Sequence, residues 1–135
     1  MIHVDSSFLI DLQREMVRKH PGAAFDVIES FDAAEILGVS VYVVCELRAG
    51  AELTKKALAE HEALDRLLLG LLVAYPDDRF PILYGRLLAA TRRTGRGVAS
   101  MDLLIGTAAL LEDAALVTRN VKDFSKIPGL RVLSY

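Results

Sequence analysis

Short apolar segments alternate with longer stretches of helical periodicity along this chain, and this alternation restricts its fold more than any other feature. The short segments are Met1–Val4, Ile36–Val39, Leu72–Tyr75, Ala115–Thr118 and Arg131–Leu133. Strands that alternate with helices usually pair in parallel through right-handed crossovers. We therefore expect an α/β domain built on a mainly parallel sheet.

The stretches between these segments have the apolar spacing of helices. We expect helices over Ser6–Arg14, Ala23–Ala34, a segment from the capping residue Ser40 to Gly50, Thr54–Leu71, Phe80–Thr94, and Met101–Glu112 capped by Ser100. The β-branched residues of Ile36–Val44 would also suit one longer strand. We prefer the shorter strand because Gly50 stands where a glycine commonly ends a helix.

The composition indicates one globular domain. The chain has 135 residues, of which 53% are hydrophobic and 25% charged, and this length supports a single core. No apolar run approaches the roughly 18 residues that span a bilayer, and no signal peptide is evident. Cys45 is the single cysteine, so no internal disulfide is possible and a cytoplasmic location is expected. We expect Cys45 to be a small core residue.

Three acidic residues stand where an apolar segment meets a turn or a helix. Asp5 follows the first short segment, Glu46 lies in the third expected helix, and Asp102 lies in the first turn of the last one. Carboxylates among apolar residues are unfavourable unless something pairs with them. A hard cation such as Mg2+ prefers oxygen ligands, so the pattern predicts a divalent-metal site. The plainer interpretations are a helix cap for Asp5, a solvent-facing residue for Glu46, and a favourable helix-dipole position for Asp102.

Further polar residues follow the segment Ala115–Val117. Ligands collect beyond the carboxyl ends of parallel strands, so we expect Asp123 to support the metal, although Asn120 and Asp123 would also suit a turn. Three hydroxyl side chains could contact waters on the metal or phosphate oxygens, or serve as ordinary caps: Ser7, Ser100 and Thr118.

The charge balance limits how the chain could bind nucleic acid. The net charge is −2, which argues against strong non-specific binding but allows a nuclease whose basic residues are local. A cluster of this kind is formed by Arg92, Arg93 and Arg96. It predicts either an RNA-backbone contact or a plain solvated loop.

Other chemistries lack their residues. The three histidines have no zinc-like spacing, and the glycines form no phosphate-binding loop. No nucleophile elbow is present. A phosphoaspartyl phosphatase would need a second aspartate two places after Asp5, where Ser7 stands.

At these residues the chain resembles the PIN-domain ribonucleases, and within them the VapC-type toxins of toxin–antitoxin pairs. The likeness covers nearly all of the chain through four segments in family order: Asp5–Ser7, Glu46–Gly50, Asp102–Ala108 and Leu116–Phe124. The resemblance implies that Asp5, Glu46 and Asp102 are the acids of the site. Asn120 stands at the fourth acidic position of the family, so Asp123 is expected to take that role.

The resemblance also implies a three-layer α/β/α sandwich of four to five strands in one domain, 1–135, and Mg2+- or Mn2+-dependent cleavage of RNA. It implies a homodimer and a cognate VapB-like antitoxin, for which the apolar surface of Thr54–Leu71 and the early helices would form a groove. Because Asn120 departs from the family pattern, the alternative is a catalytically silent PIN-like module that binds RNA or a protein partner. A DNA-directed nuclease is a second rival.

Overall fold

Five short strands form the centre of the protein in a computed structural model that describes all residues, 1–135. They are β1 (Ile2–Val4), β2 (Leu37–Ser40), β3 (Leu72–Ala74), β4 (Ala115–Val117) and β5 (Val132–Leu133). The strands make one sheet in the order β3-β2-β1-β4-β5, and every pairing is parallel. The expected α/β class and parallel sheet are confirmed.

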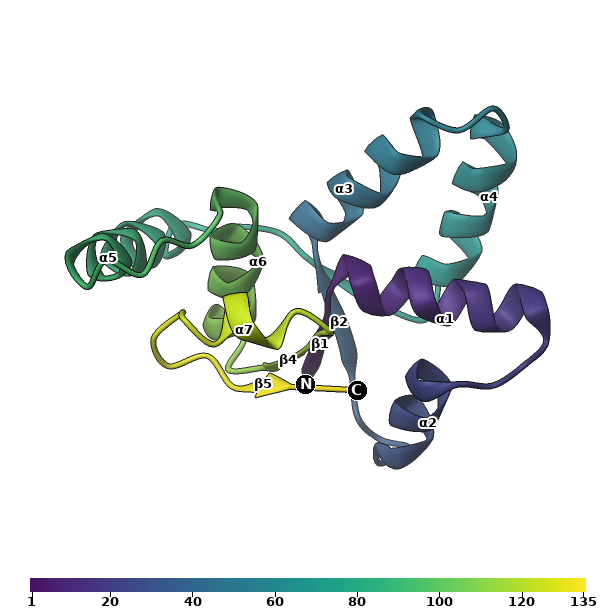
Figure 1. Ribbon diagram of the computed structural model, residues 1–135, viewed down its shortest axis with the longest axis horizontal. Helices are drawn as coiled ribbons and strands as arrows, with labels where there is room; N and C mark the ends of the chain where they lie inside the picture. Colours follow the sequence, from purple (N-terminus) through teal and green to yellow (C-terminus); the bar gives the residue numbers. More distant parts are fainter.

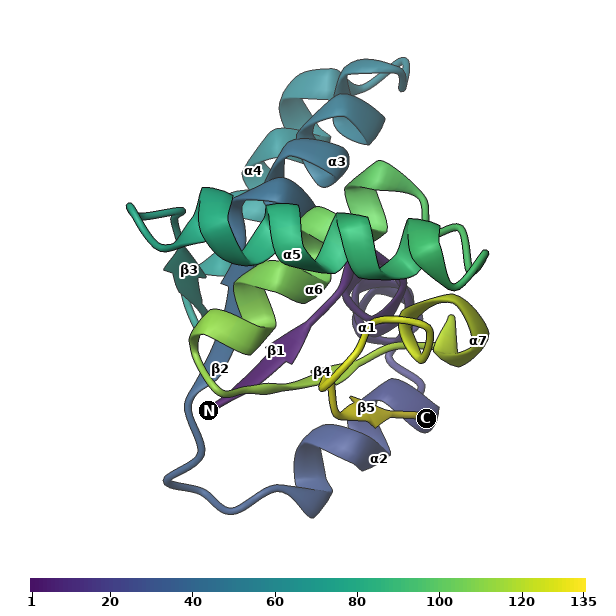
Figure 2. The ribbon, with the colours of Figure 1, turned by 90° about the vertical axis from the view of Figure 1, so that its left-hand side faces the viewer.

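Seven helices surround the sheet. They are α1 (Ser6–Arg18), α2 (Ala23–Ser30), α3 (Val41–Glu52), α4 (Ala57–Leu68), α5 (Phe80–Arg93), α6 (Ser100–Leu111) and α7 (Val121–Phe124). Figure 1 shows α5 and α6 on one side of the sheet and α1 and α2 on the other, and Figure 2 gives the same layers from the α5 side. The three-layer sandwich is therefore confirmed. No helix is both long enough and apolar enough to pass through a membrane.

The core lies where the two central strands meet the helices. Val4 of β1 and Val117 of β4 are almost fully buried, as are Phe8 of α1 and Leu103 of α6. Strands covered on both faces need apolar residues throughout, which is why the short segments carry so few polar side chains.

The strand register determines which polar residues meet beyond the sheet. Val4 of β1 lies opposite Val117 of β4, and the backbone N–H of Asp5 donates to the carbonyl of Val117 over 3.3 Å. Asp5 and Thr118 are therefore neighbours at the carboxyl edge.

Several expected helix limits were wrong. Helix α1 continues to Arg18 and ends at Lys19, which takes a left-handed φ of 52°. Helices α2 and α4 are shorter than expected, at Ala23–Ser30 and Ala57–Leu68. The four-residue helix α7 was not expected.

Glycine and serine signals were also misleading at two helix ends. Ser40 caps α3 as expected by accepting a hydrogen bond from the N–H of Val43. Helix α3 nevertheless runs past Gly50 to Glu52, because core packing continues to Ala51. Ser100 is the first residue of α6 and not its cap, and the preceding residue, Ala99, makes no side-chain cap bond.

Candidate active site

The carboxylate of Asp5 is fixed at the carboxyl end of β1. It is buried, and its Oδ1 accepts hydrogen bonds from Ser7 Oγ (2.8 Å) and from the backbone N–H of Phe8 (3.0 Å). Its Oδ2 accepts a short hydrogen bond from Thr118 Oγ1. Asp5 is thus the cap of α1, as the plainer interpretation held, while both its oxygens are also oriented by neighbouring hydroxyls.

Thr118 connects Asp5 to the segment that follows β4. Its side chain is fully buried, and its Oγ1 accepts a hydrogen bond from the backbone N–H of Asn120 over 2.9 Å. The hydroxyl therefore donates to one partner and accepts from the other. This arrangement needs a hydroxyl side chain at the end of the strand.

Asp102 lies in the first turn of α6 and is partly buried. Burial raises the pKa of Asp102 above its ordinary value, and the negative charges of Asp123, Glu46 and Asp5 raise it further. Three carboxylates from other parts of the chain therefore act on Asp102. The helix start favours a carboxylate at this position, but the surrounding acids oppose its ionisation.

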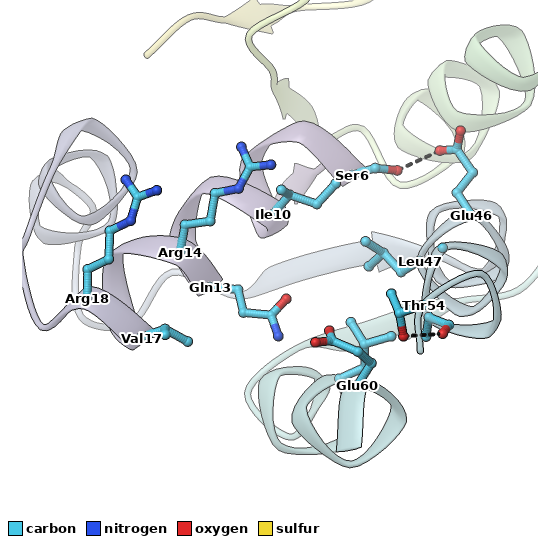
Figure 3. A pocket seen from close by; sticks show the side chains of 13 residues that line it. Ser6, Ile10, Gln13, Arg14, Val17, Arg18, Glu46, Leu47, Thr54 and Glu60 are labelled. Atoms are coloured by element: carbon cyan, nitrogen blue, oxygen red, sulfur yellow. Dashed lines mark hydrogen bonds between the residues drawn. The ribbon is translucent and has the colours of Figure 1, made fainter. Parts of the chain in front are cut away.

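Glu46 is exposed on α3 and faces the start of α1. Its Oε1 accepts a hydrogen bond from Ser6 Oγ, as Figure 3 shows. Val43, Leu47 and Ala51 form the buried face of this helix, so the neighbouring positions 45 and 46 point away from the core. The expectation that Cys45 is buried was wrong for this reason, since its side chain is exposed.

Asp123 lies on α7, close to the polar residues that follow β4. Asn120 Nδ2 donates to Asp123 Oδ2 over 3.0 Å, and Lys126 Nζ is 3.5 Å from Asp123 Oδ1. The hydrogen bond from Asn120 is the main reason that the pKa of Asp123 lies below its ordinary value. Asp123 therefore carries a full negative charge at neutral pH and adds to the field at Asp102.

The four acids have the right chemistry for a hard cation, but their side chains do not form a complete set of metal ligands. As the side chains lie, no three acidic, histidine or cysteine residues form a group that could hold a metal ion. The donors at this edge are all oxygens, which suits Mg2+ or Mn2+. Asp5 is fixed by three hydrogen bonds, whereas Glu46 is exposed and held by one.

Most of the other residues expected at the site make no contact with the acids. Ser7 belongs to the Asp5 network, but Ser100 is exposed at the start of α6 and makes no side-chain hydrogen bond with the acids. Arg92 and Arg93 end α5, and Arg96 lies in the following loop. All three are exposed, and none forms an ion pair with the acidic residues.

Comparison with known proteins identifies the family. The model of the family described as "PIN domain" matches residues 2–130. The chain belongs to the PIN domain family. It is 31% identical to Ribonuclease VapC2 of Rickettsia felis over 114 residues, 84% of this chain and 85% of that protein. It is also 31% identical to Ribonuclease VapC19 of Mycobacterium tuberculosis over 128 residues, 95% of either chain.

Solved structures give the same assignment. VapBC2 from Rickettsia felis, bound to a DNA fragment from its promoter, matches with a TM-score of 0.87 and 27% identity over 100% of this chain and 99% of that one. VapBC-1 from nontypeable Haemophilus influenzae matches with a TM-score of 0.86 and 26% identity, over 99% and 98% of the two chains. The resemblance to PIN-domain proteins expected from the sequence is confirmed.

This PIN domain has a groove of about 700 Å³ beside the acidic edge, between α1, α3 and α4. Its floor is apolar and is lined by Ile10, Leu47, Ala51 and Leu64, while the exposed Val17 lies on the α1 side. Arg14 and Arg18 lie along the α1 side, and Glu46 lies beside Ser6 at the start of α1 (Figure 3). The groove therefore leads from an apolar channel to one of the candidate site residues.

Sequence reasoning missed several residues around the PIN-domain site. Ser6 was not singled out, although it binds Glu46. Asp11 was also missed, although it accepts a hydrogen bond from Tyr135 Oη over 2.7 Å and lies 3.1 Å from Arg119 Nη1. No local signal marked Asp11, because its spacing from Asp5 does not place the two on one helix face, and the contact with Tyr135 joins residues too far apart in the chain to predict.

Proposed function

We propose that this PIN domain is a metal-dependent endoribonuclease, the toxin of a VapBC-type pair. The observation that carries the proposal is that the charges of Asp123, Glu46 and Asp5 all act on Asp102 at one edge of the sheet, where two hydroxyls fix Asp5. Relatives named Ribonuclease VapC, aligned over most of the chain, support it. We propose the activity for residues 1–135 as one domain, since they share one sheet and one core.

Asp5, Asp102, Glu46 and Asp123 would hold the Mg2+ or Mn2+ ion. Such an ion, when bound, acidifies water and stabilises negative charge on a phosphate. Ser7 and Thr118 keep both oxygens of Asp5 directed by hydrogen bonds, which holds a ligand ready without a change of rotamer. Lys126 Nζ lies 3.5 Å from Asp123 Oδ1 and limits how much negative charge accumulates there.

Glu46 suits the handling of a proton. One of its oxygens, Oε1, is bound by Ser6 Oγ, and the other is free on an exposed side chain. The free oxygen can accept a proton from the water that attacks the phosphodiester. The new P–O bond forms from that water, and the P–O bond to the leaving ribose oxygen breaks.

We propose that the groove between α1, α3 and α4 receives the VapB-like antitoxin. Structures of relatives are complexes of VapB with VapC, and the groove combines an apolar floor with charged rims. It includes Thr54, Glu60 and Leu64, within the surface expected from the sequence. A homodimer and a cytoplasmic location are proposed with it, and light scattering after size-exclusion chromatography tests the dimer.

Cleavage assays on matched RNA and DNA substrates, with Mg2+ and with EDTA, test the function. We expect the RNA alone to be cut, and cutting to stop in EDTA. Asp5→Asn should lower the rate by about a hundredfold or more, whereas Asp78→Asn, at an exposed acid in the loop before α5, should not change it. DNA cleavage would support the second rival, and no cleavage together with no calorimetric signal for Mn2+ would support the silent module.

A further inference from the structure

Arg119 is the basic residue most directly linked to Asp5. It follows Thr118 at the carboxyl end of β4, and its backbone N–H lies 3.4 Å from Ser7 Oγ, which in turn donates to Asp5 Oδ1. Its guanidinium is 60% exposed. The main chain of Arg119 is thus held against the site, while its charged group is open to a ligand at the rim.

The guanidinium is held by a single acidic residue. Arg119 Nη1 lies 3.1 Å from Asp11 Oδ2 and 3.4 Å from Asp11 Oδ1. The guanidinium is open to solvent, whereas the Asp11 side chain is only 17% exposed. Solvent screens such a pair only in part, so Arg119 can leave if other groups stabilise the Asp11 carboxylate. Asp11 keeps other partners when it does, since Tyr135 Oη donates to it and Arg14 lies 3.7 Å away.

A polyanion needs positive charge near this site. The charges of three acids act on Asp102 here, and the chain carries a net charge of −2. Lys126, on the same side, already lies against Asp123. Guanidinium groups bind phosphate oxygens in pairs and are weakly hydrated, so Arg119 is the group best suited to a phosphate at this rim.

We propose that Arg119 contacts a phosphate of the RNA next to the bond that is cut, and that Asp11 holds the guanidinium until RNA arrives. This inference rests on the proposed ribonuclease function. It assigns RNA binding to Arg119, which lies outside the cluster of Arg92, Arg93 and Arg96. It also gives Asp11 a defined effect, because Asp11 competes with the RNA for one guanidinium.

The test measures binding of a short labelled single-stranded RNA over a range of salt concentrations. The binding variants are made in protein that carries Asp102→Asn, so that the RNA is not cut. Arg119→Ala should weaken binding about tenfold and reduce the slope of log affinity against log salt by about 0.7. Arg119→Lys should keep the slope. Asp11→Asn should tighten binding by up to about fivefold.

A second arginine–aspartate pair, in which the aspartate is fully exposed, provides a control away from the acids. Arg131 is 65% exposed, and its Nη2 lies 3.9 Å from Asp113 Oδ1 and donates to the Asp113 carbonyl over 2.8 Å. This pair lies beyond the other end of α6 from Asp102. Arg131→Ala and Asp113→Asn should therefore leave both the affinity and the salt slope unchanged.

The outcomes separate the inference from the function. If wild-type protein cuts RNA but Arg119→Ala leaves the salt slope unchanged, or Asp11→Asn weakens binding, the assignment of Arg119 is overturned while the function stands. Thermal melting shows whether Arg119→Ala is folded. If it is not, a folded Arg119→Lys whose salt slope equals that of the wild type still supports a charge contact. If the wild-type protein neither binds nor cuts RNA, both are overturned.

Discussion

The imidazole ring of His3 occupies the space that a side chain at Gly38 would need. The two residues lie opposite each other on β1 and β2, and a Cβ added at Gly38 would stand 2.8 Å from His3 Cδ2 and 3.0 Å from His3 Nε2. His3 is fully buried, and neither ring nitrogen has a hydrogen-bond partner. The glycine thus makes room for a polar ring in the centre of the sheet.

Gly38→Ala should destabilise the protein by about 1–3 kcal/mol, because the added methyl group overpacks against a ring that cannot move in a close-packed core. Gly85→Ala is the matched control. Apart from its chain neighbours and the helix backbone, no atom lies within 4 Å of the position of a Cβ at Gly85. Alanine there replaces glycine inside α5, so stability should rise by about 0.5–1 kcal/mol. Thermal or urea unfolding measures both. An unchanged midpoint for Gly38→Ala would contradict the packing argument.

Stability should fall as the pH decreases because of His3. Burial, and then the charge of the N-terminus, lowers the pKa of His3 from 6.5 to about 4 in the folded protein. Between these pH values the unfolded chain binds a proton that the folded protein does not, so folding is penalised by about 1.4 kcal/mol per pH unit and by roughly 3 kcal/mol at most. Below pH 4 both states bind the proton, and this loss stops increasing.

Urea unfolding in EDTA between pH 7 and pH 4 measures the effect, with His3→Leu as the comparison. Carboxylates contribute to the acid dependence of both proteins, so the difference between them isolates His3. The variant should lose less stability over this range, whatever its stability at pH 7. Equal losses would show that the ring of His3 is protonated in the folded state.

The order of strands and helices could be predicted from the sequence because both faces of the sheet are covered. A doubly covered strand has no polar face, so each one appears as a short apolar segment that is recognisable without knowledge of its neighbours. Parallel pairing then places Asp5 and Thr118 at the same edge. The apolar segments and their parallel pairing were therefore enough to predict Asp5 as a site residue.

The limits of helices and the orientation of side chains on them could not be predicted. Gly50 looked like a helix end, but the buried residues Leu47 and Ala51 hold α3 together beyond it. Cys45 lies two positions from Val43 and Leu47 and therefore falls outside the buried face. Contacts such as that of Asp11 with Tyr135 join the two ends of the chain, and no local pattern encodes them.

Thr118→Val should weaken Mn2+ binding and RNA cleavage by about 10–100-fold, the usual effect of removing a group that orients a metal ligand. The substitution keeps the shape of the side chain but removes the Oγ1 that donates to Asp5 and accepts from the Asn120 N–H. Thr118→Ser retains the hydroxyl and should retain most activity. Calorimetry with Mn2+ and the cleavage rate are the two measurements, and a serine variant as weak as the valine variant would contradict this role.

Asp102→Asn should have opposite effects on stability with and without metal. Burial and the charges of Asp123, Glu46 and Asp5 oppose ionisation of Asp102, so the neutral side chain should raise the melting temperature in EDTA. Saturating Mn2+ should stabilise the wild-type protein by about 2.7 kcal/mol at a hundredfold excess over Kd and the variant much less. Asp78→Asn serves as the control and should follow the wild type. A lower melting temperature for Asp102→Asn in EDTA would show that the acids do not repel one another.

Val17→Asp should release the toxin from its antitoxin without affecting RNA cleavage. Val17 is 77% exposed and lines the groove on the α1 side, so a buried carboxylate there would oppose an apolar partner segment. Leu58→Asp is the matched control, because Leu58 is 75% exposed on α4 but does not line the groove. Cleavage assays with increasing amounts of the neighbour-encoded antitoxin should show at least about tenfold weaker inhibition of Val17→Asp than of Leu58→Asp. Equal inhibition of the two variants would place the antitoxin on another surface, and loss of cleavage by Val17→Asp alone would indicate that the groove serves RNA.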